Sequence, residues 1–124
     1  MCNEISDEEM SKKMLKRIEK EYGYVPLVNQ VLSERPDLFV PSVNVNKSVF
    51  YGKAKLEKKT RHLAAISAAS ALGAEHCLTV QMQLATKYGA TKDEILEALQ
   101  IGAVISMTCA QATSFRKYKE MFPE

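Results

Sequence analysis

Residues 56–77 read LEKKTRHLAAISAASALGAEHC, and this stretch decides the fold. Its charged beginning gives way to residues 61–72, whose side chains are mostly small and apolar on nearly every face. Neighbouring helices can approach such a segment closely, so we expect it to form a buried helix that ends at Gly73. Cys77 follows at the start of the next expected helix.

Helical signals continue on both sides of this stretch. A hydroxyl residue stands three positions before a glutamate in residues 6–9 and again in residues 91–94, which is the capping-box pattern. The alternation in residues 43–46 resembles a short strand, but the sequence offers no partner strand for it. We therefore predict an all-α fold, a single-domain helical bundle over residues 1–124. The expected helices cover residues 6–22, 24–34, 36–51, 61–72, 77–88, 91–105 and 108–121.

The composition is typical of a soluble protein, with 46% hydrophobic and 26% charged residues among 124 and a net charge of +2. Acidic and basic residues interleave, so no basic stripe fits a phosphate backbone and we expect no nucleic-acid partner. Arg61 and Glu75 bracket the stretch that we take as the longest apolar candidate, which is too short to span a membrane. The first residues lack a signal-peptide pattern, so we expect a cytoplasmic protein without a membrane partner.

The three cysteines, at positions 2, 77 and 109, show no metal-ligand spacing. We therefore expect no metal, no cofactor and no disulfide scaffold. At a helix start, Cys77 faces unpaired backbone amides and the positive end of the helix dipole, which favours the thiolate. The alternative is a small apolar residue buried at that start. A redox C-x-x-C motif would need a cysteine at Ala74, and a proton carrier would need a histidine at Gln81.

The order and spacing of several segments are informative together. They are EYGYVP (21–26), RPDL (35–38), LEKKTR (56–61), the alanine-rich helix, GAEHC (73–77) and YGATKDEI (88–95). These segments resemble the core of the carboxymuconolactone decarboxylase family, which includes the alkylhydroperoxidase D-like proteins. The resemblance covers nearly the whole chain and implies an all-α domain that assembles into a trimer, a hexamer or a related ring. The apolar surface of so short a chain also favours a homo-oligomer.

The resemblance implies two chemistries. Alkylhydroperoxidase D-like members reduce peroxides or disulfides with a C-x-x-C pair, a histidine four residues after the second cysteine and a glutamate twelve before the first. The true decarboxylases lack this pair and act on a muconolactone. In this chain the glutamate position falls on His62, the first cysteine on Ala74 and the histidine on Gln81. Cys77 alone is retained, at the position that attacks peroxide in those members, so the two-cysteine cycle is not available.

Three hypotheses follow. The first is a thiol-dependent peroxidase or disulfide oxidoreductase with Cys77 as its nucleophile, His62 as a candidate base and an external thiol as reductant. The second is a lyase without a cysteine mechanism, in which His62 and Gln81 hold an acidic lactone in a pocket. The third is a non-catalytic oligomeric scaffold or small-molecule-binding protein.

Each remaining candidate has a structural interpretation as well as a functional one. His76 is a candidate for the substrate pocket, although its place before the cysteine also suits a packing or surface residue. His62 follows the polar residues 59–61, which favours a solvated or structural side chain over a buried base. Cys109 is a candidate resolving thiol, but we expect it in the core. Cys2, near the terminus, is expected to be incidental.

Overall fold

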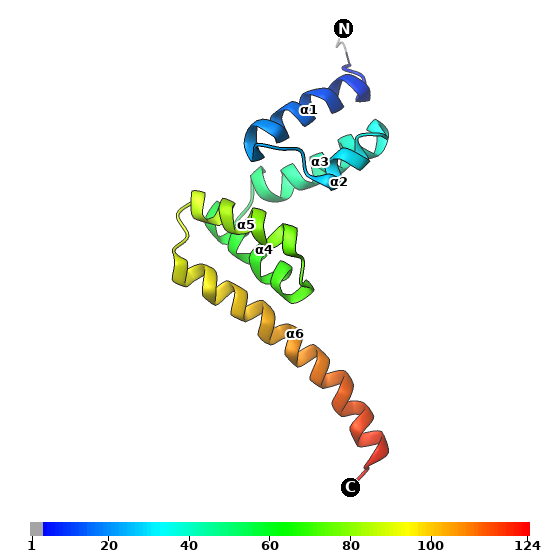
Figure 1. Cartoon of the computed structure of the whole chain (residues 1–124), viewed down its shortest axis with the longest axis vertical. Coiled ribbons are helices and arrows are strands. Elements are labelled where there is room, and N and C mark those ends of the chain that lie inside the picture. The colour runs from blue at the N-terminus through cyan, green and yellow to red at the C-terminus, as the bar shows by residue number, and fades with distance from the viewer. Residues whose placement is uncertain (1–3) are drawn as a thin grey trace. The chain divides into compact units, whose positions relative to one another are not determined.

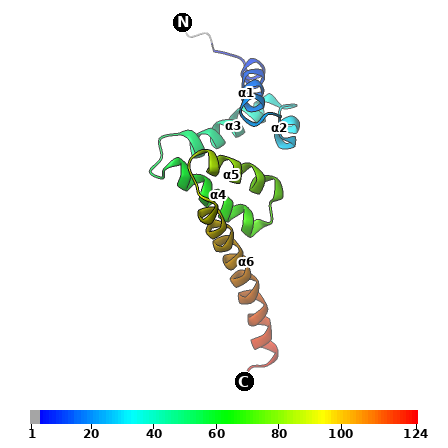
Figure 2. The same cartoon turned by 60° about the vertical axis from the view of Figure 1, so that its left-hand side comes forward.

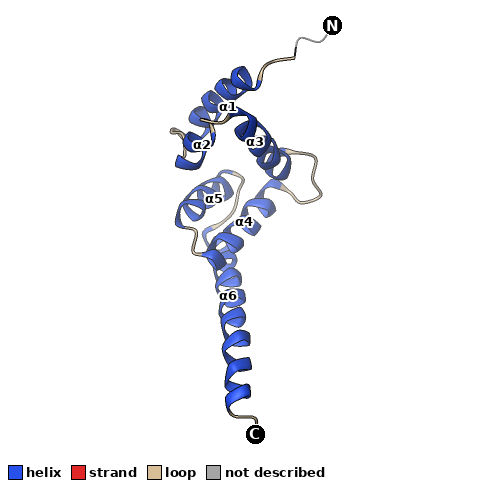
Figure 3. Ribbon diagram, turned by 90° about the vertical axis from the view of Figure 1, so that its right-hand side faces the viewer, coloured by secondary structure: helices blue, strands red, loops and turns tan. Residues whose placement is uncertain are grey.

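The computed structural model describes residues 4–124, and this range contains six α-helices and no strand (Figures 1 and 3). The helices are α1 (Asp7–Tyr22), α2 (Leu27–Leu32), α3 (Pro36–Tyr51), α4 (Lys58–Leu72), α5 (Glu75–Lys87) and α6 (Lys92–Met121). The predicted all-α fold is therefore confirmed. Helices α1–α3 form one compact unit that ends at Ala54, and α4–α6 form a second over Lys55–Glu124. The single domain over residues 1–124 stays a prediction.

The first unit is held together between α1 and α3. Ser6 caps α1, because its hydroxyl accepts a hydrogen bond from the Glu9 amide at 3.2 Å. Met14 on α1 packs with Phe39 on α3, and both are buried. Residues 43–46 lie inside α3, so their alternation is not a strand. The first unit is thus a helical pair with a small apolar core, and the short α2 connects its two long helices.

The last turns of α1 and α3 are joined by a hydrogen bond from the Tyr51 hydroxyl to Glu21 Oε1, at 2.8 Å. Partial burial raises the pKa of Tyr51 above its ordinary value, and the hydrogen bond to Glu21 raises it further. Because this bond joins the carboxyl ends of both helices, later residues of α1 and of α3 lie towards the same end of the pair.

The second unit is centred on α4, which packs against both α5 and α6. Its core contains Ile66, Ala85, Ala90 and Ala98. The predicted end of the alanine-rich helix at Gly73 is confirmed, since that residue has a left-handed φ of 66°.

Small residues allow α4 and α6 to cross closely. A Cβ atom added to Gly102 would overlap the carbonyl oxygen of Ser67. The Ser67 hydroxyl donates to the Ala98 carbonyl at 2.7 Å, and the Ser70 hydroxyl donates to the Leu99 carbonyl at 2.9 Å. The absence of a side chain at Gly102 therefore brings the two helices near enough for these serine bonds.

Three local predictions differ from the structure. Helix α4 begins at Lys58 and α5 at Glu75, a few residues earlier than expected. Residues 91–105 and 108–121 belong to one helix, because no glycine or proline stands between Gly102 and Pro123 to end it. The alanine-rich helix is not buried all round, since α5 and α6 cover only part of its circumference and leave Leu72 82% exposed.

Helix α6 corrects the expectation that no apolar run approaches a membrane span. The longest uncharged run is residues 98–115, and α6 is long and apolar enough to cross a membrane by length and composition alone. Only 11% of that segment is buried. Figures 1 and 2 show α6 continuing well beyond α4 and α5, and every residue from position 103 onward is exposed.

Candidate active site

The second unit buries an imidazole between two helices. His62 on α4 is fully buried, and its Nδ1 atom lies 2.8 Å from Oε1 of Gln81 on α5. Because an amide oxygen can only accept, Nδ1 carries the proton of this bond. The ring also stacks on Tyr88, with the ring centroids 5.3 Å apart and the planes within 5°. Of the two roles expected from the polar residues 59–61, solvated or structural, the solvated one is therefore wrong, because α5 supplies both a polar and an aromatic partner.

Cys77 is the third residue of α5 and is exposed. The first hydrogen bond within α5 runs from the Leu78 amide to the Ala74 carbonyl at 2.9 Å, so Cys77 lies in the turn whose amides have no acceptor within the helix. Ala74 provides no side-chain cap for this turn. The alternative interpretation of Cys77 as a buried apolar residue is wrong, and the thiol is open to solvent.

Cys77 and Gln81 share one face of α5, because residues four positions apart are neighbours on a helix. Long side chains in a helix point back towards its amino end, which directs Gln81 towards the turn that carries Cys77. Gln81 is partly buried, and its oxygen is engaged by His62. The structure therefore joins the buried His62 ring to Gln81, and the helical repeat puts the exposed Cys77 on the same face of α5 as Gln81.

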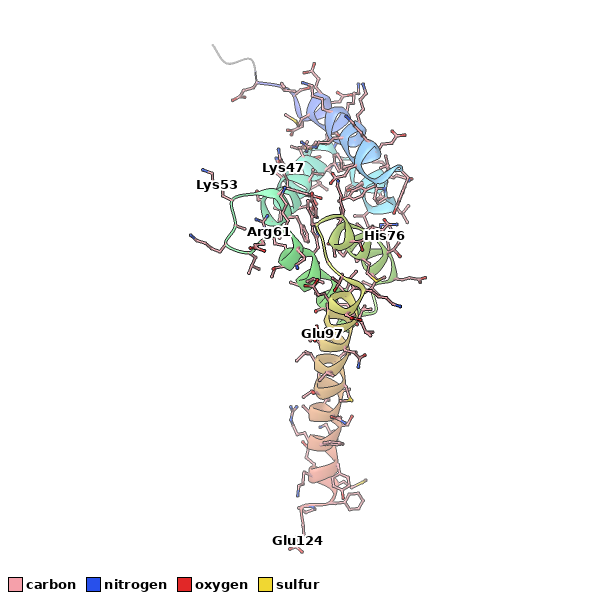
Figure 4. All side chains as sticks on the ribbon, turned by 90° about the vertical axis from the view of Figure 1, so that its left-hand side faces the viewer. Lys47, Lys53, Arg61, His76, Glu97 and Glu124 are labelled. Atoms are coloured by element: carbon pink, nitrogen blue, oxygen red, sulfur yellow. The ribbon has the colours of Figure 1, made fainter. Side chains whose placement is uncertain are left out.

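The other candidate residues take no part in the His62–Gln81 bond. His76 on α5 is exposed, as Figure 4 shows, which agrees with a surface position. Cys109 on α6 is also exposed, so its expected place in the core is wrong; the distal half of α6 has nothing packed on it within residues 4–124. Cys2 lies outside the described residues. Among residues 4–124, no three histidine, cysteine, aspartate or glutamate side chains come together in a way that could hold a metal ion.

Tyr88 was not a predicted site residue, yet it covers one face of the His62 ring. Lys58 Nζ lies 5.2 Å from the centre of the tyrosine ring and Lys87 Nζ lies 5.8 Å from it. These distances fit cation–π contacts. The sequence position of Tyr88 could have indicated its place at the site, because Tyr88 stands seven residues after Gln81 and so lies on the same face of the helical path.

A salt bridge joins the starts of α4 and α6 near this site. Lys59 Nζ lies 3.0 Å from Oε2 of Glu94, and the two side chains are 34% and 33% exposed. Glu94 also accepts the backbone N–H of Thr91 at 2.9 Å, which completes the predicted capping box. The Thr91 amide, and then Lys59, hold the pKa of Glu94 below its ordinary value. The turn of α4 that precedes His62 is thereby tied to α6.

Comparison with known proteins identifies the family of the chain. The family model described as "Carboxymuconolactone decarboxylase family" matches residues 36–120, which is more than half of the chain. No curated protein and no solved structure gives a significant match. The match extends over α4 and α5, whose side chains build the site described above. The chain belongs to the carboxymuconolactone decarboxylase family.

Proposed function

We propose that the protein is a thiol-dependent oxidoreductase that reduces hydroperoxides with Cys77 as its one nucleophile. The observation that carries this proposal is the exposure of Cys77 in the uncapped first turn of α5. Helix starts favour anions, so this position suits a thiolate and the charge that develops on an attacked peroxide. Exposure gives a substrate and an external thiol access to the sulfur.

The proposed cycle needs one protein thiol. The Cys77 thiolate attacks one peroxide oxygen; a sulfur–oxygen bond forms, the oxygen–oxygen bond breaks, and the leaving alkoxide takes a proton to become an alcohol. The sulfur is oxidised to a sulfenic acid while the peroxide is reduced. An external thiol then attacks the sulfenic sulfur and water leaves, which forms a mixed disulfide. A second external thiol attacks that disulfide and returns Cys77 to its reduced form.

His62 and Gln81 have separate parts in this proposal. The buried His62 ring holds the Gln81 oxygen, while the amide N–H groups of Gln81 take no part in that bond and belong to the α5 face that carries Cys77. These donors would stabilise negative charge at the thiolate or at the leaving oxygen. His62 then acts as a positioning residue through Gln81, in place of the direct base expected from sequence. His76, exposed beside Cys77, would flank the substrate.

The test is consumption of tert-butyl hydroperoxide with dithiothreitol as the thiol, followed for wild type, Cys77→Ala and the matched Cys109→Ala. We expect Cys77→Ala to abolish turnover and Cys109→Ala to retain it, because both cysteines are exposed but only Cys77 lies beside Gln81. Mass spectrometry after dimedone treatment should locate the sulfenic acid at Cys77. Unchanged turnover in Cys77→Ala would contradict the proposal.

A lyase is the second candidate, and one specific observation favours it. The His62–Gln81 pair is a partly buried polar pair that needs no thiol, and the chain lacks the second cysteine at Ala74. Such a pair suits orientation of an acidic lactone. Decarboxylation of carboxymuconolactone that survives Cys77→Ala but is lost in Gln81→Leu would establish this function. If the wild-type protein shows neither peroxidase nor decarboxylase activity, the remaining candidate is the non-catalytic binding protein.

We also propose that the protein is a cytoplasmic homo-oligomer, a trimer or a hexamer, in which α6 from Ile101 onward is the contact surface. Its large apolar side chains are mostly exposed, namely Ile101, Val104, Ile105, Met107, Phe115, Tyr118 and Met121. Association with further copies would cover this surface. A membrane is the less suitable partner. The first part of the uncharged run contains Ala98 and Gly102, which are buried against α4 and so cannot face lipid.

A further inference from the structure

We infer that the first unit contains a binding site for a small amphipathic anion, a carboxylate or phosphate with an apolar chain, separate from the Cys77 chemistry. The site is an open groove of about 460 Å³ between α1 and α3. This volume is in the range of small-molecule sites. Its α1 half precedes residues 36–120, whereas its α3 half lies within them, so only part of the groove belongs to the segment that matches the family.

The floor of the groove is apolar. Met14 is buried, and Met10 and Val40 are partly buried beside it. These residues pack around the same core that holds Phe39. Methionine side chains are flexible and adapt to the shape of an apolar guest. The floor therefore suits an alkyl chain better than a rigid polar molecule.

The rim of the groove is cationic. Lys13 and Arg17 from α1 and Lys47 from α3 line it, with Asp7 as the one lining carboxylate. Figure 4 labels Lys47 on α3. Among residues 4–124, none of these three cations has an ion pair or a side-chain hydrogen bond. Three unpaired cations from two helices above an apolar floor attract an anionic head group.

The two ends of the groove differ in charge. Because the Tyr51–Glu21 bond joins the carboxyl ends of α1 and α3, Arg17 and Lys47 lie towards that same end. Asp7 lies at the amino end of α1. An anionic head group therefore binds near Arg17 and Lys47, with its chain running along the methionine floor away from them. Charge complementarity at one end and apolar contact along the rest define the ligand class.

The experiment is an NMR titration of the full chain with octanoate, 1-octanol, acetate and inorganic phosphate, read from methyl and amide shifts. We expect octanoate to shift Met10, Met14 and Val40, and to bind about tenfold more tightly than 1-octanol or acetate. Arg17→Glu should weaken octanoate binding by about tenfold. Lys16→Glu makes the same charge change at an exposed position outside the groove. The octanoate affinity of this variant should stay within about twofold of the wild-type value.

Four results would overturn the inference. They are the absence of shifts with octanoate, shifts confined to residues outside the groove, equal binding of 1-octanol, and equal weakening by Arg17→Glu and Lys16→Glu. A lipid surface is the other source of the same head-group chemistry. Flotation with phosphatidylglycerol vesicles distinguishes it. Vesicle binding that Arg17→Glu abolishes and Lys16→Glu retains, without octanoate binding, would assign the groove to a membrane instead. Circular dichroism of each variant establishes that its helices are intact.

Discussion

The Nδ1 atom of His62 lies 2.8 Å from Oε1 of Gln81, and this bond links a fully buried ring on α4 to the face of α5 that carries Cys77. In the related members with a C-x-x-C pair, a glutamate and a histidine are expected at these two positions. In this chain the histidine, His62, is on α4, and Gln81 occupies the expected histidine position on α5. In this chain an imidazole–amide hydrogen bond joins the two helices.

The first prediction concerns this link. Gln81→Leu removes the partner of a buried polar ring, so we expect a loss of about 1–3 kcal/mol in the free energy of unfolding. Urea denaturation followed by circular dichroism measures it. The control is Gln83→Leu, because Gln83 is exposed on the same helix. Equal stability of the two variants would show that the buried bond contributes nothing measurable.

The second prediction concerns the crossing of α4 and α6. In an exposed helix, Gly102→Ala would be stabilising by about 1 kcal/mol. Here the added Cβ overlaps the carbonyl oxygen of Ser67, a backbone atom that cannot move aside without shifting α4. We therefore expect a net loss of about 1–3 kcal/mol in thermal or urea unfolding. Ser114→Ala on the exposed part of α6 is the control, and a stabilising Gly102→Ala would refute the close crossing.

The third prediction is a pH dependence at the start of α6. The pKa of Glu94 is lowered in the folded state, first by the Thr91 amide and then by Lys59. Its contribution to stability is therefore fully present above the ordinary glutamate pKa, about 4.3, and is lost as the pH falls through the lower folded value. The difference in unfolding midpoint between wild type and Glu94→Gln should thus shrink from pH 7 to pH 3.

Glu97→Gln provides the comparison for that titration, because Glu97 is exposed on the same helix and has no ion pair among the described residues. Its unfolding midpoint should differ little from that of wild type across the same range. A Glu94→Gln difference that stays constant with pH would mean that the charge of Glu94 is not the stabilising feature.

The fourth prediction tests self-association through α6. Ile105 is 63% exposed and lies on the apolar side of the distal helix. Ile105→Lys places a charge in the proposed contact, so the oligomer should dissociate to smaller species in light scattering after size exclusion. Ser106→Lys adds the same charge on the adjacent, polar side and should leave the oligomer intact. A wild-type protein that is monomeric at micromolar concentration would refute the proposal.

Local signals in the sequence predicted much of the helical framework. The caps at Ser6 and Thr91 and the helix ends at Gly23 and Gly73 are all present. Each depends on interactions within one or two turns, so the residues that decide it are adjacent in the chain. The division of α6 into two helices was wrong because residues 106 and 107 contain no glycine or proline to interrupt it.

The position of His62 was not predictable in this way. Its sequence neighbours are polar, while its actual surroundings, Gln81 and Tyr88, come from α5. Cys109 was likewise expected in the core, but no other helix within residues 4–124 covers that part of α6. In both cases a distant segment decides the exposure, and the local composition carries little information about which segment that is.

The sequence by itself determined that the chain is all-α, that it resembles the carboxymuconolactone decarboxylase family, and that Cys77 lacks the second cysteine at Ala74. The tertiary structure decided that Cys77 is exposed, that His62 is buried against Gln81, and that a cationic groove forms between α1 and α3. The physical reason is the distance along the chain over which the deciding interactions act. Helix formation and capping depend on residues a few positions apart, whereas burial, hydrogen bonds between helices and the lining of a groove depend on which helices pack together.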